Sequence, residues 1–124
     1  MSSMIQLAIP LLHVSDAIAA EKFYCDGLGF EKSFDYRPFG EDGPCYMQLV
    51  RDGVRVHLSN FPEDGKAGNV AVLIVDNIHI LYEEFMLKGV EIELPPTDQT
   101  WGNREMYIKD ADNNCIRYTQ WLQG

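Results

Sequence analysis

The chain has 124 residues, 46% of them hydrophobic and 11% aromatic, which is enough to form a core and too apolar for a disordered protein. This length allows one domain, or two small halves that share a core. Nineteen acidic residues against ten basic ones give a formal charge of −9. This charge argues against nucleic acid as a partner and favours the attraction of cationic small molecules.

The N-terminal segment, MSSMIQLAIPLLHVSD, is apolar but short, lacks a basic region and contains Pro10. We therefore expect neither a signal peptide nor a membrane span, and no membrane partner. The chain has three cysteines without a CxxC spacing, namely Cys25, Cys45 and Cys115. Reduced thiols are expected, which favours a cytoplasmic protein.

In the first half, residues 5–14 are rich in Leu and β-branched side chains and predict a strand. Ser15 and Asp16 form a helix N-cap pair, and an apolar stripe predicts a helix from Ala17 to Leu28, ended by Gly27 and Gly29. Three further strands are predicted at 30–37, 45–50 and 54–59.

The second half repeats this order at a spacing of about 60 residues, which indicates a duplicated half-domain. A strand is predicted at 69–75, then a helix from Ile78 that stops at Gly89. Three more strands are predicted at 90–94, 104–109 and 115–121. The predicted organisation is a first module at 1–60, a Pro- and Gly-containing linker at 61–68 and a second module at 69–124, all within one structural domain.

These elements predict an α+β fold of two βαβββ modules. One helix can cover only one face of a four-stranded sheet, so the other face stays open. Joining the two sheets gives a curved mixed β-sheet trough with the helices outside, a cleft suited to a small molecule. We also expect a homodimer, because the sheet edges and the apolar N-terminal strand need partners.

Alternation along the strands predicts the chemistry of this open face. Val54, Val56 and Leu58 share the helix side of their strand, which leaves Arg55, His57 and Ser59 on the other. Across both halves, the polar residues expected on the open face are Arg55, His57, Asn69 and Arg117.

Three segments, IPLLHVSDAIAAEKFYCDGLGF, VRDGVRVHLS and DQTWGNREMYIKDADNNCIRY, resemble the bleomycin-resistance branch of the glyoxalase/bleomycin resistance/dioxygenase superfamily, also called the vicinal oxygen chelate superfamily. The similarity covers nearly the whole chain. The resemblance implies paired βαβββ modules that assemble as a dimer, in which N-terminal strands are often exchanged.

Enzymes of this superfamily hold a divalent metal with four side chains, mostly His or Glu, one from each of four strands. The resemblance places those positions at Ile9, His57, Asn69 and Arg117. Only His57 is a good metal ligand, because isoleucine has no lone pair and arginine is a fixed cation. We therefore expect no metal, no other cofactor and no catalytic residue, and we expect a binding protein rather than an enzyme.

The predicted ligand contacts combine aromatic and polar residues. Trp101 lies in a loop beside Gly102 and would form an aromatic wall. The resemblance places a groove aromatic at Tyr46, with Phe39 assisting. His57, Ser59 and Asn60 would complete the groove and its rim.

The leading hypothesis is a metal-free protein that sequesters a bleomycin-type antibiotic, whose class the resemblance describes as having a planar bithiazole and a cationic tail. One alternative is a metal-dependent glyoxalase-like lyase or dioxygenase that uses His13, His57 and Glu105. Another is a binder of a different planar metabolite.

Overall fold

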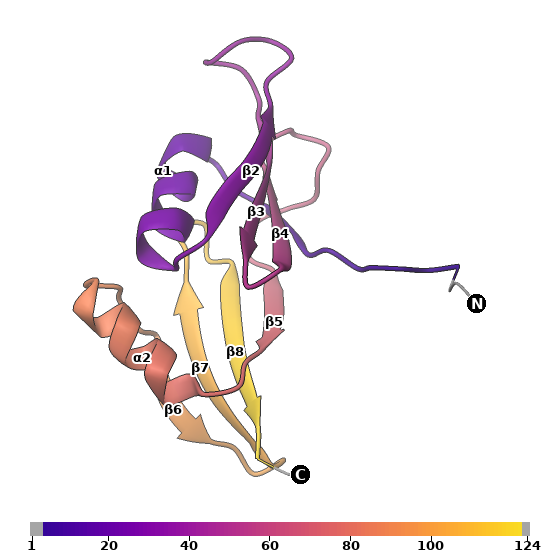
Figure 1. Ribbon diagram of the computed structural model, residues 1–124. Helices are drawn as coiled ribbons and strands as arrows, with labels where there is room; N and C mark the ends of the chain where they lie inside the picture. The colour runs from indigo at the N-terminus through magenta and orange to yellow at the C-terminus, as the bar shows by residue number, and fades with distance from the viewer. Residues whose placement is uncertain (1–3, 123–124) are drawn as a thin grey trace.

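The computed structural model describes residues 4–122 and contains two four-stranded mixed sheets (Figure 1). The first sheet has the order β1-β4-β3-β2 and the second the order β5-β8-β7-β6. Within this part of the chain, no helix has the length and apolar character needed to cross a membrane. The α+β class and the two βαβββ modules are confirmed.

The elements of the first module are β1 (Leu11–His13), α1 (Ala17–Lys22), the π-helical turn η1 (Phe23–Gly27), β2 (Glu31–Tyr36), β3 (Tyr46–Arg51) and β4 (Val54–Ser59). Those of the second are β5 (Val70–Ile74), α2 (Ile78–Leu87), β6 (Leu94–Asp98), β7 (Asn103–Lys109) and β8 (Cys115–Trp121).

The two sheets share one pairing pattern, which confirms the internal repeat. β1 runs parallel to β4, and β5 runs parallel to β8, while the other pairs are antiparallel. Gln48 lies opposite His57 in the first sheet, as Tyr107 lies opposite Arg117 in the second. These registers make the two pairs structural equivalents.

Both helices begin at the caps that the sequence indicates. Asp16 Oδ1 accepts hydrogen bonds from the backbone N–H groups of Ile18 and Ala19, both at 3.1 Å. Asn77 caps α2 in the same way. A short polar side chain at this position satisfies amides that have no partner within the helix.

The first helix is not α-helical throughout, contrary to the prediction for 17–28. After Lys22 the chain widens into η1, where the Leu28 amide bonds to the Phe23 carbonyl, five residues back. This wider turn places Tyr24 and Leu28 in the core. Gly29 then turns with a positive φ of 78°, a conformation that favours glycine. A Cβ there would also displace the Arg51 guanidinium.

Two strand boundaries were wrong. The predicted strand at 5–14 pairs only over Leu11–His13, and the earlier apolar residues Ile5 and Leu7 are exposed. The strand predicted at 90–94 instead lies at Leu94–Asp98. It tolerates Pro95 and Pro96 because it forms the edge of its sheet and because the register with β7 shifts between Leu94 and Thr97, so neither proline is a paired ladder position.

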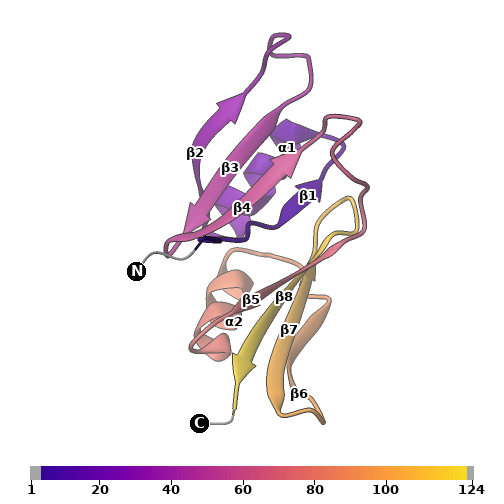
Figure 2. The same cartoon turned by 90° about the vertical axis from the view of Figure 1, so that its right-hand side faces the viewer.

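The two modules share one hydrophobic core, to which both α1 and α2 contribute. In Figure 1 both helices lie on the same side of the strands. The opposite faces of the sheets are turned toward the viewer in Figure 2. We call these the first and second open faces; they carry Tyr46, Gln48 and His57, and Glu105, Tyr107 and Arg117, respectively.

Candidate functional site

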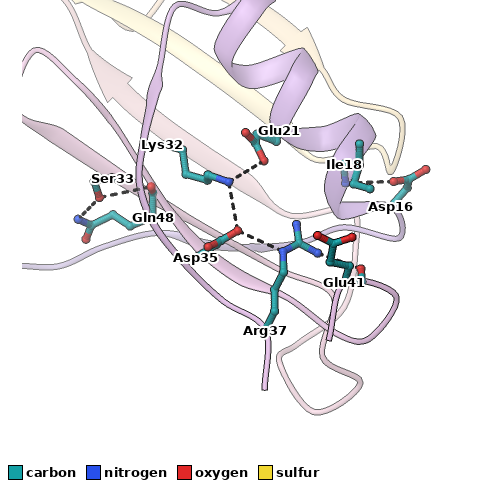
Figure 3. Close-up of polar contacts among 9 residues, drawn as sticks. All are labelled: Asp16, Ile18, Glu21, Lys32, Ser33, Asp35, Arg37, Glu41 and Gln48. Atoms are coloured by element: carbon teal, nitrogen blue, oxygen red, sulfur yellow. Dashed lines mark hydrogen bonds and ion pairs between the residues drawn. The ribbon is translucent and has the colours of Figure 1, made fainter. Parts of the chain in front are cut away.

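The first open face is built around His57. Its Nδ1 lies 2.6 Å from the Tyr46 hydroxyl, and its Nε2 lies 2.9 Å from Gln48 Oε1. Gln48 in turn bonds to Ser33 on β2 (Figure 3). The Phe34 ring meets the imidazole edge-on, with centroids 6.1 Å apart. Burial, and then the charge of Arg55, lowers the pKa of His57, so the imidazole is neutral at pH 7.

The second open face is built around the carboxylate of Glu105, which is only 3% exposed. One oxygen accepts a hydrogen bond from Trp101 Nε1 at 3.0 Å and the other from the Tyr107 hydroxyl at 2.7 Å. Burial alone would raise the pKa of Glu105, but the hydrogen bonds from Tyr107 and Trp101 and the charge of Arg117 outweigh it and lower the pKa. The carboxylate is therefore ionised.

Arg117 lies over the Tyr107 ring, with its Cζ 4.7 Å from the ring centroid. This distance is typical of a cation–π contact. The Nε atom of Arg117 is buried and has no hydrogen-bond partner among residues 4–122.

The Trp101 side chain is anchored by its indole N–H, while much of the residue is exposed to solvent. Its indole N–H is anchored to Glu105, yet 61% of the residue is exposed. Gly102 follows with a φ of 96°, and its amide closes the turn on the Gln99 carbonyl. A fixed, exposed aromatic ring loses little conformational entropy when a flat ligand stacks on it.

The remaining predicted contacts lie at different depths. Ser59 is fully buried, and its hydroxyl donates to Asp64 and accepts from the Phe61 amide. Asn60 Oδ1 accepts from the Cys45 amide at 2.6 Å. Phe39 lies in the β2–β3 loop and is 76% exposed. These polar atoms are engaged within the chain, whereas the Phe39 ring is free to contact a ligand.

The structure thus groups Tyr46 with His57 on the first sheet, and Trp101 with Glu105 on the second. Sequence reasoning missed Gln48 and Tyr107. Strand alternation alone could have found Gln48, two residues from Tyr46. Glu105 does not pair with its neighbour Arg104, which bonds to Asp98 instead.

Asn69 was wrongly expected on the second open face. In the observed register Val72 lies beside Arg117, so the open row of β5 is Val70, Val72 and Ile74. These three residues are roughly half exposed. Asn69 precedes the strand, and its side chain donates to the Lys66 carbonyl. The open face of β5 is therefore apolar.

A groove of about 740 Å³ lies between the two halves. The N-terminal segment from Leu7 to Pro10, the β3–β4 turn and the apolar row of β5 all contribute to its walls. The groove reaches Arg55 at its edge, while Tyr46 and Trp101 are outside its lining.

Comparison with known proteins agrees with this architecture. A family model described as glyoxalase superfamily protein matches residues 2–124. The bleomycin resistance protein of Geobacillus stearothermophilus is 31% identical, over 94% of this chain and 98% of that protein. The chain belongs to the glyoxalase superfamily, in its bleomycin-resistance branch.

Solved structures of superfamily members share the fold. A bleomycin-binding protein from Streptomyces verticillus, in complex with copper(II)-bleomycin, is 27% identical and superimposes with a TM-score of 0.72, over 94% of this chain and 98% of that one. A superfamily member from Sphaerobacter thermophilus is 25% identical, with a TM-score of 0.73 and the same coverage of both chains.

The superfamily's metal-binding positions do not fit a metal here. Both nitrogens of His57 are engaged by Tyr46 and Gln48, and Arg117 contributes a cation. Across residues 4–122, no three His, Cys, Asp or Glu residues gather closely enough to hold an ion. The alternative set of His13, His57 and Glu105 is thus not brought together.

Proposed function

We propose that this chain binds and sequesters a bleomycin-type antibiotic, without a metal of its own and without a chemical step. This proposal rests mainly on Trp101. Its indole N–H is hydrogen-bonded to a buried carboxylate, while 61% of the residue is exposed. The relatives that are named for bleomycin resistance, or solved with bleomycin bound, support this ligand class.

The physical basis is a combination of flat rings and charge. Trp101 and Tyr46, assisted by Phe39, supply aromatic surface for a planar group. Aromatic stacking contributes only about 0.5–1.5 kcal/mol per pair, so burial of apolar ligand surface must supply most of the affinity. The net charge of −9 attracts a cationic group of the ligand.

We further propose that the chain acts as a homodimer in the cytoplasm, with residues 1–60 and 69–124 as its two modules and 61–68 as the linker. Support for the dimer comes from the sheet edges. Leu11 on β1 and Val70 and Val72 on β5 are exposed edge-strand residues, and a second copy would cover them. Sedimentation at micromolar concentration should give a dimer mass; a monomer would contradict this proposal.

The ligand proposal is tested by calorimetric titration with metal-free bleomycin and with copper(II)-bleomycin. We expect saturable binding by the wild type and about tenfold weaker binding by Trp101→Ala, as for loss of an aromatic anchor. Trp121→Phe is the control, because Trp121 is another exposed tryptophan and lies at the end of β8. If neither form of the drug binds at micromolar concentration, the proposal is wrong.

A further inference from the structure

The hydrogen bonds around His57 have a direction, which follows from the orientation of the Gln48 side-chain amide. Ser33 Oγ lies 3.4 Å from the Gln48 carbonyl oxygen and 2.8 Å from Gln48 Nε2 (Figure 3). A carbonyl oxygen can only accept, so the single hydroxyl hydrogen of Ser33 points to it. In the structure Gln48 Nε2 donates to Ser33 Oγ, and Gln48 Oε1 faces His57 Nε2.

The same argument continues through the imidazole. Gln48 Oε1 accepts, so His57 Nε2 carries the ring hydrogen. A neutral imidazole has one such hydrogen, so Nδ1 offers a lone pair. The Tyr46 hydroxyl, 2.6 Å away, donates its only hydrogen to that lone pair. The phenol oxygen retains lone pairs and has no hydrogen left for a ligand.

We infer that Tyr46 is an acceptor-only position, so the ligand carries a hydrogen-bond donor, such as an ammonium or amide N–H, where it meets this phenol. The inference rests on the proposed function of ligand binding and adds the polarity of one contact. It makes Tyr46 a specificity-determining residue, with His57 and Gln48 as positioning residues. A ligand with a carbonyl or carboxylate at this point would face a second acceptor and be rejected.

The equivalent position in the second module has the same polarity. Tyr46 pairs with Ser59 as Glu105 pairs with Thr119, and the ionised Glu105 is also an acceptor. Both modules thus place an acceptor oxygen at this position. The Glu105 carboxylate is only 3% exposed and already accepts from Trp101 and Tyr107, so the Tyr46 phenol is the one of the two that can accept from a ligand.

The protonation of His57 determines where the Tyr46 hydroxyl hydrogen points, so the charged groups around the imidazole are important. Arg55, a cation on the same strand, opposes protonation of the imidazole. The neighbouring strands place these groups around it: Tyr46 and Gln48 from β3, Phe34 from β2 and Leu11 from β1. Of these neighbours only Tyr46 is titratable, and burial raises the pKa of its phenol. A carboxylate in place of Gln48 would favour the imidazolium, which would donate from Nδ1 and turn the Tyr46 hydrogen outward.

The first test uses ligand-free protein labelled with ¹⁵N. Long-range ¹H–¹⁵N spectra at neutral pH should show His57 protonated at Nε2 alone, assigned with the help of a His57→Phe sample. Protonation at Nδ1, or at both nitrogens, would overturn the inference. This test is independent of the proposed function because it needs no ligand.

The second test measures metal-free bleomycin affinity. Tyr46→Phe should weaken binding about three- to tenfold, the usual effect of one lost hydrogen bond. Gln48→Glu should weaken it similarly, while its spectrum shows an imidazolium. Tyr36→Phe is the control, because this phenol lies opposite Tyr46 on β2 and is exposed. Unchanged affinity in Gln48→Glu, together with the imidazolium signal, would refute the inference. Absence of all binding would refute the proposed function. In that case the protonation of His57 in the spectra would still show whether the inference is right.

Discussion

Asn114, just before β8, donates a hydrogen bond from Nδ2 to the backbone carbonyl of His13 on β1, at 2.7 Å. The two residues belong to different modules. Asn114 Oδ1 also accepts from the amides of Gly68 and Asn69, at 3.0 and 3.1 Å. This buried amide therefore fastens the first module, the linker end and the second module at one point.

Removing this amide should destabilise the fold. Asn114→Ala leaves the amides of Gly68 and Asn69 and the His13 carbonyl without their partner. An unsatisfied group costs about 1–3 kcal/mol when fully buried and less where water reaches it, as it does at these partly buried groups. Allowing for water entry and relaxation, we expect a loss of about 2–5 kcal/mol in the free energy of unfolding, measured by urea denaturation.

The control for this variant is Asn113→Gly. Asn113 has a positive φ of 63°, a conformation that glycine adopts easily, and its free energy of unfolding should change by less than about 0.5 kcal/mol. Equal destabilisation of both variants would show that the turn conformation matters, and not the Asn114 bridge.

A second link between the modules predicts a pH effect. Arg51 on β3 makes two hydrogen bonds to Glu84 on α2, at 2.7 and 2.8 Å. The Arg51 guanidinium lowers the pKa of Glu84. A carboxyl with a lowered pKa in the folded state contributes stability above its unfolded pKa, and the contribution is lost as the pH falls through the folded pKa.

Glu84→Gln should therefore reduce the free energy of unfolding by about 1 kcal/mol at neutral pH. The difference from the wild type should shrink once the pH falls below the ordinary pKa of glutamate. Urea denaturation of both proteins across this range measures the difference. Glu83→Gln, a change at the preceding position of the same helix, is the control. A pH-independent difference would mean that shape, rather than charge, accounts for the effect.

The sequence predicts the structural features that depend only on residues near one another in the chain. Asp16 and Asn77 are readable as caps because the cap needs only a short polar side chain before an apolar stripe. The open placement of Arg55 and His57 follows from the two-residue period of a strand. These features do not depend on which strands become neighbours.

The sequence cannot predict what depends on pairing between distant strands. Asn69 was misplaced because both rows of β5 are apolar, so alternation gave no signal until β8 fixed the register. The Trp101–Glu105 bond depends on how the loop before β7 folds back. The Leu94–Asp98 strand was missed because its two prolines are acceptable only at a sheet edge or where the register shifts.

The lowered pKa of His57 predicts a second effect of pH on the free energy of unfolding, and its sign follows from the direction of the pKa shift. Its pKa is lowered from the ordinary 6.5, so below that pH the unfolded chain binds more protons at this residue than the folded chain does. The folded state should lose stability as the pH falls through this range, until the folded imidazole is protonated as well. Urea denaturation from about pH 7.5 to about pH 5 measures this loss.

His57→Phe should show a shallower loss over the same range, because the titrating group is absent. His79→Gln, a change at an exposed histidine, controls for the removal of a histidine from the surface. Parallel pH curves for the wild type and His57→Phe would show that His57 does not contribute to the slope.

Long-range charge should govern how fast a cationic antibiotic binds. The net charge of −9 acts over a screening length of about 8 Å at physiological salt and about 3 Å at 1 M. Raising the salt concentration should therefore slow the association of metal-free bleomycin, measured by stopped-flow fluorescence, and change its dissociation less.

Glu105→Gln should both slow association slightly and speed dissociation, because Trp101 loses its charged hydrogen-bond partner. Glu63→Gln removes the same charge from the exposed linker and should affect association alone. Equal dissociation rates for the two variants would show that the Glu105 carboxylate does not hold Trp101 for the ligand.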